Sequence, residues 1–496
     1  MALGHNDNAR KLIPRWRSPA STVVLEMPTT PKGPLGPDAA ASLAQKLEEW
    51  RAHPNPGTRG DLLSAAVVFG ANDVVAEVRA SDPPNSSTTE AIAQLLQIPD
   101  ANDDAPIRRD ERVLIRHARS HLALEPRDPL RWMELSRALT IVGSRHRASR
   151  AMRVALLQAP RCRIVLRSAA RLAVHEGEPE RARSILNNSG LLDRDPWLLA
   201  TEISVTSLME KTSTWMKRAQ RLVESERFAP RDLSELAAAL GTEERESGST
   251  RNARKLFERA LRDPTENVVA QAMWASRNGV NIAVPQETWA ATRGRYEAES
   301  LSSYFGGDWR ASLRATEQWF ADEPFSRRPS IQASYVSAVA LEEYAQSVEF
   351  ARRGLIANPS DFTLRNNLAF ALAHLGQLKE AEQHLLLASK VASSSLERVV
   401  VAATAGLLAL RSGDIEGGSR AYEAAEAGAA RDEFLTLSVR AFRALERLGV
   451  GQLVSTEELT GLLEALRKWR RPESRALYSR LARALRTWSL PFDDAM

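Results

Sequence analysis

Apolar residues recur every three or four positions along most of the chain, the spacing that gathers them on one face of an α-helix. These helical stretches are interrupted by short breaks such as Asp128-Pro129 and Asp195-Pro196. Proline lacks a backbone donor and the residue before it avoids helical geometry, so each pair marks the end of one helix and the start of the next. The pattern therefore predicts an all-α fold built from many short helices.

The helical pattern repeats with a period of about 34 residues, which indicates a repeat architecture. Two positions in each copy, twelve residues apart, carry small side chains: Ser136/Ala148, Ala170/Ala182, Gly241/Ala253, Ala369/Ala381 and Gly406/Gly418. We expect the two helices of a pair to approach most closely there, where a large side chain would push them apart. Since several copies share one phase, the repeat predicts helix pairs stacked on one another.

This pattern resembles the tetratricopeptide-repeat family, clearly in five copies and more loosely over about residues 110–488. The resemblance implies a right-handed superhelical solenoid of helix pairs. Its first helices would line a concave groove, and partners of such proteins usually bind there.

The ends of the chain depart from the repeat. Six prolines fall within residues 1–37, which we predict to be an irregular arm. The arm either stays a tethered segment, which the sequence favours, or lies in a groove or against an edge through the apolar run 21–27. Divergent short helices are expected over 38–98, a polar acidic linker over 99–109, the solenoid over 110–454 and capping helices over 455–496.

Composition narrows the function classes. Lys and Arg total 67 against 62 Asp and Glu, a net charge of +5 that does not require a nucleic-acid partner. The single cysteine, Cys162, excludes an intrachain disulfide framework and a multi-cysteine metal site, and it favours a reducing compartment. Neither a secretory signal nor an apolar run long enough to cross a bilayer is evident. We therefore expect a cytoplasmic protein with no membrane partner.

Arginine is concentrated between Leu135 and His175, where nine arginines occur without any Asp or Glu. Guanidinium groups bind carboxylates and phosphates in a bidentate manner, so this stretch suits an anionic partner. Repeat geometry places Arg137, Arg167 and Arg171 on first helices that face the groove. A second helix turns its arginines outward: Arg145, Arg147, Arg150 and Arg153. The alternative is a solvated face whose arginines pair with acids of adjacent repeats.

A second basic cluster, which includes Arg470, Arg471 and Arg475, is interleaved with Trp469 and Tyr478 near the C-terminus. Basic residues with aromatics suit nucleic acid. They also suit a capping helix whose aromatics pack inward, and the sequence favours the cap.

Signatures of catalysis are weak. His117 and His121 have the i, i+4 spacing of zinc ligands but lack the glutamate of a metalloprotease motif, so an exposed or partly packed pair is the favoured interpretation. Cys162 lies between two arginines, which favours a lowered thiol pKa, but no motif supplies a partner histidine. We expect no catalytic residue, metal or cofactor.

Two functions follow as hypotheses. The first is a non-enzymatic scaffold or adaptor that binds an acidic or extended segment of a partner protein, and that regulates or recruits an enzyme. Its groove residues would be Arg137, Arg167, Arg171 and Asn367. The Asn367 amide either hydrogen-bonds an extended backbone or lies on the helix surface without a ligand, and the sequence favours neither. The second is a nucleic-acid-binding regulator that uses the outward and C-terminal arginines. A homo-oligomer is compatible with both, and an enzyme within residues 1–105 is the least supported idea.

Overall fold

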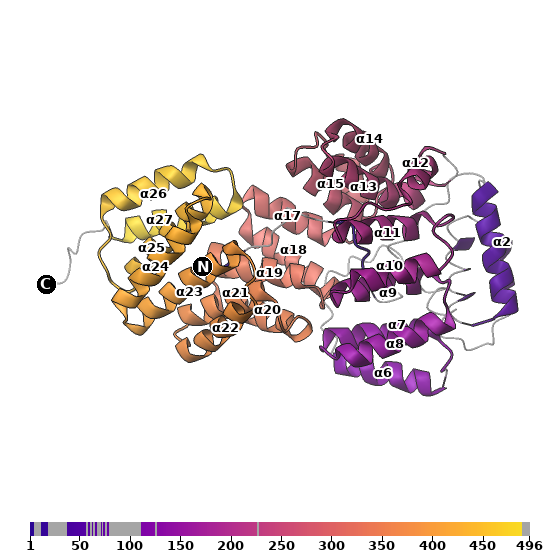
Figure 1. Ribbon diagram of the computed structural model, residues 1–496, viewed down its shortest axis with the longest axis horizontal. Helices are drawn as coiled ribbons and strands as arrows, with labels where there is room; N and C mark the ends of the chain where they lie inside the picture. The colour runs from indigo at the N-terminus through magenta and orange to yellow at the C-terminus, as the bar shows by residue number, and fades with distance from the viewer. Residues whose placement is uncertain are drawn as a thin grey trace. The chain divides into compact units, whose positions relative to one another are not determined.

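The computed structural model describes residues 1–3, 11–17, 37–55, 58–59, scattered positions between 62 and 78, 111–124, 126–225 and 228–488. Within these ranges all regular secondary structure is helical (Figure 1). The chain divides into two compact units: a C-terminal unit of Met1–Asn6 with Glu299–Met496, and an N-terminal unit of Asp7–Ala298. The predicted solenoid of residues 110–454 contributes to both. The predicted linker 99–109 and the apolar run 21–27 lie outside the described residues.

Aspartate caps and prolines start helices of the N-terminal unit where the sequence predicts breaks. The Asp128 side chain accepts hydrogen bonds from the first backbone amides of its helix, and Asp195 does the same for another. The helices of this unit are α2 (Pro37–Ala52), α6 (Glu111–Leu124), α7 (Pro129–Ile141), α8 (Arg145–Gln158), α9 (Arg163–His175), α10 (Pro179–Asn188), α11 (Pro196–Leu208), α12 (Met216–Glu224), α13 (Pro230–Glu246), α14 (Thr250–Ala260), α15 (Glu266–Arg277) and α16 (Gln286–Ala291).

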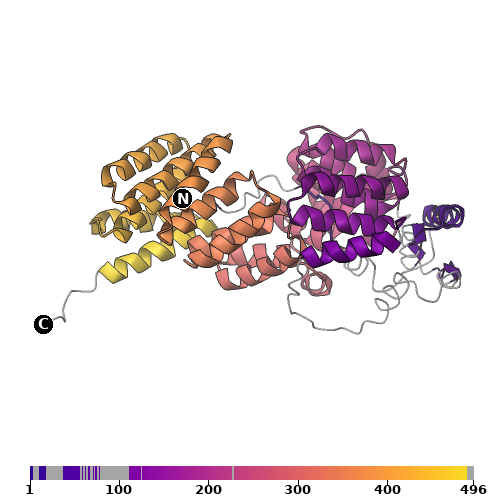
Figure 2. The ribbon, with the colours of Figure 1, turned by 90° about the horizontal axis from the view of Figure 1, so that it is seen from below.

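Helices of the N-terminal unit are arranged in two layers. Consecutive helices pair, as α7 does with α8 and α13 with α14, while α7, α9, α11, α13 and α15 contact one another in succession. The helices α11 and α13 are buried over most of their length, whereas α10 buries only Ala182 and Leu186. We call the succession α7, α9, α11, α13, α15 the inner layer of this unit; Figure 2 shows neighbouring helices of the unit side by side.

The C-terminal unit repeats the arrangement. Its helices are α18 (Trp309–Asp322), α19 (Arg327–Tyr335), the π-helical turn η1 (Val336–Ala340), α20 (Tyr344–Ala357), α21 (Phe362–His374), α22 (Leu378–Val391), α23 (Ser395–Ser412), α24 (Ile415–Ala429), α25 (Glu433–Gly449), α26 (Thr456–Lys468) and α27 (Pro472–Trp488); α17 (Tyr296–Gly306) begins in the N-terminal unit and ends in this one. Its inner layer is α19, α21, α23, α25 and α27. Helices α26 and α27 occupy the predicted capping segment, and Leu477 and Leu481 are buried there.

The helix pairs are those that the tetratricopeptide resemblance implies, because the small residues lie where paired helices meet. The Ser136 hydroxyl donates to the Ala148 carbonyl, with 2.8 Å between the oxygens. A Cβ atom on Gly406 would lie 2.6 Å from the Tyr422 ring, closer than any real contact. The sequence prediction of an all-α stack of helix pairs is confirmed. No helix among the residues described is long and apolar enough to span a membrane.

Candidate functional site

An extended segment of the arm, Lys11–Arg17, lies against the inner layer of the N-terminal unit. It has no regular secondary structure, and Leu12, Pro14 and Trp16 are buried. Leu12 belongs to the apolar core formed by α11, α13 and α15. Two inner-layer side chains hold its main chain: Asn267 Nδ2 donates to the Ile13 carbonyl at 3.0 Å, and Arg137 Nε to the Trp16 carbonyl at 3.1 Å. The segment is therefore seated by contacts to both its backbone and its apolar side chains.

Each basic side chain of this segment pairs with a carboxylate. Arg17 Nη1 lies 2.7 Å from Glu266 Oε1, and both side chains are buried. Arg15 pairs with Glu297, also buried. Lys11 pairs with Glu246, lies 3.8 Å from Glu243 Oε1 and donates to the Ser207 hydroxyl at 2.7 Å. The surface that receives the arm is thus acidic; we call these four glutamates, Glu243, Glu246, Glu266 and Glu297, the arm carboxylates.

Electrostatics at Glu266 depend on the arm. Burial pushes the pKa of this carboxyl upward, but the Arg17 and Arg15 guanidinium groups outweigh burial and hold it below its usual value. At Glu243 burial prevails over the neighbouring Lys11 ammonium and raises the pKa. Without the arm, Glu266 would lose its two main counter-charges, Arg17 and Arg15.

A second segment of the arm, Met1–Leu3, lies on the inner layer of the C-terminal unit. Asn367 on α21 accepts a hydrogen bond from the Leu3 amide and donates to the Leu3 carbonyl, both at 2.8 Å. Asn366 Nδ2 donates to the Met1 carbonyl at 2.7 Å. The Met1 amino group donates to Thr404 Oγ1 on α23 at 2.7 Å, and burial lowers the pKa of that amino group to about 4. These contacts, which we call the amide site, are mainly hydrogen bonds to the main chain of an extended segment.

The predicted groove residues have different surroundings. Arg137 and Asn367 contact the arm, as described, and Arg171 is half-buried on α9. Arg167 is only 4% exposed; it pairs with Glu235 Oε2 at 2.6 Å and lies over the Trp197 ring at 4.6 Å. The expectation that Arg167 offers its charge to an incoming partner therefore needs correction, because Glu235 of α13 already takes up that charge.

The arginines of α8 are expected to face outward, away from the groove. Arg147, Arg150 and Arg153 are exposed. Arg145 differs, since it lies 2.9 Å from Glu178 and 3.6 Å from Glu176, acids that belong to the turn before α10. The cluster is thus a solvated face that is partly neutralised by an adjacent repeat.

The C-terminal arginines lie in the predicted capping segment, and two of them contact neighbouring residues. Arg470 is exposed, whereas Arg471 lies over the Phe434 and Trp469 rings at 4.6 and 5.2 Å. Arg475 donates to the Phe305 carbonyl at 3.0 Å. Trp469 is half-buried against Phe434 and packs inward as expected of a cap, whereas Tyr478 is exposed.

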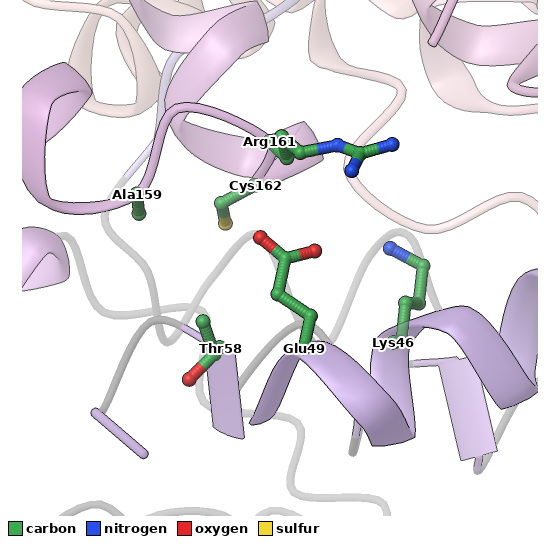
Figure 3. Close-up of a pocket in the computed structure, with 6 residues that line it drawn as sticks. All are labelled: Lys46, Glu49, Thr58, Ala159, Arg161 and Cys162. Carbon is green, nitrogen blue, oxygen red and sulfur yellow. The ribbon is translucent and has the colours of Figure 1, made fainter. Parts of the chain in front are cut away.

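A small pocket of the N-terminal unit contains Cys162, which is buried (Figure 3). Its lining comes from α2, from Thr58 and from the turn between α8 and α9: Lys46, Glu49, Thr58, Ala159, Arg161 and Cys162. The Glu49 carboxylate points toward the cysteine, and no histidine is among the lining residues. The pocket therefore lacks the thiol–imidazole pair of a cysteine nucleophile.

The predicted histidine pair lies on the surface of α6. The Nε2 atoms of His117 and His121 are 3.2 Å apart. No group of three potential metal ligands is found within the part of the chain that the structure describes.

Sequence reasoning missed the arm carboxylates, Asn267 and Thr404. One signal was available: Glu266-Asn267 and Asn366-Asn367 are adjacent polar residues within inner helices that are rich in apolar residues. Buried polar residues need partners. In both units the arm supplies one.

Comparison with known proteins adds little. No protein-family model matches the chain, and no curated protein does. Three solved structures align with the chain, each with a TM-score of 0.32. Yeast Tom70 is 12% identical over 76% of this chain and 93% of its own, and the APC/C hetero-tetramer Cut9–Hcn1 is 12% identical over 90% of this chain and 93% of its own. The human IFIT1 dimer with PPP-AAAA is 11% identical over 92% of this chain and 96% of its own. Scores this low carry no argument, so the resemblance to tetratricopeptide repeats rests on the helix pairs themselves.

Proposed function

We propose that the protein is a non-enzymatic helical-repeat scaffold that binds extended segments of partner proteins on the inner layers of its two units. One observation carries the proposal: both inner layers hold extended segments of the chain itself through hydrogen bonds to the main chain. Asn367 engages the amide and the carbonyl of Leu3, as a strand partner would. Contacts to the main chain accept many sequences, which suits the recognition of a partner segment.

Photo-crosslinking tests this function. A photoreactive residue replaces Arg171 on the inner helix α9, and a matched variant carries it at Arg153, which is exposed on the outer helix α8. The expected result in cells of the source organism is a protein adduct at Arg171 alone, mapped by mass spectrometry to one contiguous segment of the partner. Equal labelling from both positions, or no protein adduct at Arg171, contradicts the scaffold.

Nucleic-acid binding is the second candidate, supported by the exposure of Arg147, Arg150 and Arg153 on one helix. Phosphate contacts release counterions, so affinity for nucleic acid falls linearly on a log–log plot against salt concentration. A triple change of these arginines to Gln should flatten that slope by about three if they contact phosphates. If the triple variant has the same slope as the wild type, these arginines do not contact phosphates and nucleic-acid binding by the α8 face is contradicted.

A further inference from the structure

We propose that the inner layer of the N-terminal unit is a site for a basic, extended segment of a partner protein, and that Lys11–Arg17 occupies it as a displaceable self-ligand. This inference deepens the proposed function and rests on it for the existence of a partner. It replaces the expectation of an acidic partner segment with a basic one at this surface.

The contacts of Lys11–Arg17 with the inner layer resemble those of a bound peptide. Three of the seven residues are cationic, and each of the three pairs with a carboxylate of the unit. Buried ion pairs add little net stability over apolar packing, because desolvation offsets the attraction. They do discriminate strongly, since a segment without matching charges would leave buried carboxylates without counter-charges.

The spacing of charges defines the ligand. Lys11, Arg15 and Arg17 pair with the arm carboxylates, while Leu12 packs in the apolar core of the unit and Pro14 and Trp16 are buried. Proline favours an extended course and reduces the entropy lost on binding. The ligand class is therefore an extended segment with a buried aromatic between two arginines and a third cation four residues before the first arginine.

Because the arm occupies the site, a partner segment must compete with the arm in order to bind. A tethered ligand acts at an effective concentration that reaches the millimolar range for short flexible connections. A free segment of the same sequence then binds weakly to the intact protein. Weakening the arm's own ion pairs opens the site without touching the inner layer.

The experiment uses the full chain. The probe is a fluorescein-labelled peptide of residues 11–17, KLIPRWR, and the control peptide ELIPEWE reverses its charges. Fluorescence anisotropy compares the wild type, the arm variant Arg15→Glu/Arg17→Glu, and the matched variant Arg147→Glu/Arg150→Glu, which makes the same charge change on α8. We expect the arm variant to bind the basic peptide at least about tenfold more tightly than either other protein. The control peptide should not bind.

A second set of variants keeps the test decisive if charge reversal unfolds the unit. Arg15→Ala/Arg17→Ala removes the charges without reversing them, and circular dichroism verifies the fold of each protein. Adding Glu266→Gln/Glu297→Gln to this variant should weaken peptide binding by about tenfold or more, because the charged partners are lost.

Two results overturn the proposal. A folded arm variant that does not bind the basic peptide shows that Lys11–Arg17 is a fixed part of the core. Equal binding of both peptides shows that the arm carboxylates do not select charge. The outcome is separable from that of the scaffold. Peptide binding without a protein adduct at Arg171 removes the scaffold and its partner but leaves the self-ligand, whereas an adduct without peptide binding removes the self-ligand alone.

Discussion

Individual residues at the helix contacts limit how closely the repeats pack. Gly406 and Gly418 stand in one helix pair, where added Cβ atoms would come within 2.6 Å of Tyr422 and Leu410 respectively. Tyr422 is buried, so its ring cannot move aside into solvent. Glycine is thus required here by space, although it weakens a helix interior intrinsically.

Gly406→Ala should therefore destabilise the C-terminal unit by about 1–3 kcal/mol, because the new methyl group overpacks the contact with Tyr422. Gly461→Ala on α26 is the matched control, since nothing lies within 4 Å of the added atom. The control should be neutral or stabilising by less than about 1 kcal/mol, given the better helix propensity of alanine. Urea unfolding followed by circular dichroism measures both, and similar effects of the two changes would argue against this contact.

Arg167 is a second residue whose role is structural. Its pair with Glu235 is buried, and Thr265 Oγ1 lies 3.3 Å from the other Glu235 oxygen. Removal of one member of a buried pair leaves an uncompensated charge, whereas removal of both does not.

We expect Arg167→Leu to lower the free energy of unfolding of the N-terminal unit by about 3 kcal/mol or more. The double change Arg167→Leu/Glu235→Leu should recover most of that loss, and Arg153→Leu on the exposed face of α8 should change it by less than about 0.5 kcal/mol. Denaturant unfolding measures all three variants, and adding Glu235→Leu completes the cycle that gives the coupling energy. A double variant as unstable as the single one would rule out this account of the pair.

Among the elements, the π-helical turn η1 explains a break in the repeat. Ser334 and Ser347 take the small positions of their helix pair, because the Ser347 hydroxyl donates to the Ser334 carbonyl at 2.8 Å. They are one residue further apart than the other small pairs. The wider turn of Val336–Ala340 accommodates that insertion while the helices keep their contact. A period that shifts by one residue is therefore still one structural repeat.

Helices α21, α23 and α25 are joined by a buried polar network. His374 stacks on Tyr344 with 4.2 Å between ring centroids, and its Nδ1 lies 2.9 Å from Arg411 Nη2. Because Arg411 donates to Nδ1, the imidazole proton is on Nε2, which is 3.1 Å from Glu446 Oε1. Burial lowers the pKa of His374, and Glu446 only partly opposes it. Burial tends to raise the pKa of Glu446, but His374 and Arg411 hold it at about 2.

Acid should therefore weaken the C-terminal unit in two steps. Below about pH 6.5 the unfolded state binds more protons at His374 than the folded state does, so the free energy of unfolding falls as the pH falls. The Glu446 contribution is present above about pH 4.5 and is lost only toward pH 2. His374→Gln should flatten the unfolding profile between pH 7 and 5 more than His384→Gln does, since His384 is only half-buried. If the two changes flatten the pH profile of unfolding equally, His374 is not the group that makes the unit sensitive to acid.

At the scale of the whole molecule, local periodicity accounts for what the sequence predicts well. Helix starts at Asp128-Pro129 and Asp195-Pro196 depend on neighbouring residues and match the structure. Pairing between distant residues does not show in such patterns. Arg167 is separated from Glu235 by 68 residues and Arg17 from Glu266 by 249, so neither partner could be named from the sequence. The amide site was partly foreseen, because Asn367 lies on the inner face of the clearest repeat.

Loss of the arm contacts should be visible as a local change. In the Arg15→Glu/Arg17→Glu variant we expect faster amide hydrogen exchange around Glu266 on α15 and around Glu297, because these two carboxylates lose their partners. Helices α21 and α23, which hold Met1–Leu3, provide the internal comparison and should exchange at their usual rate. Faster exchange throughout the chain would instead indicate general unfolding.

The order of synthesis gives the docked arm one more consequence. Arg17 leaves the ribosome 249 residues before Glu266, the carboxylate that receives it. At elongation rates of about 5–20 residues per second, this interval lasts on the order of 10–50 s. During that time the arm has no place to bind, and the helices that will receive it are still being made. Binding of Lys11–Arg17 to the inner layer is thus a late folding event, which is complete only after translation has passed Glu297.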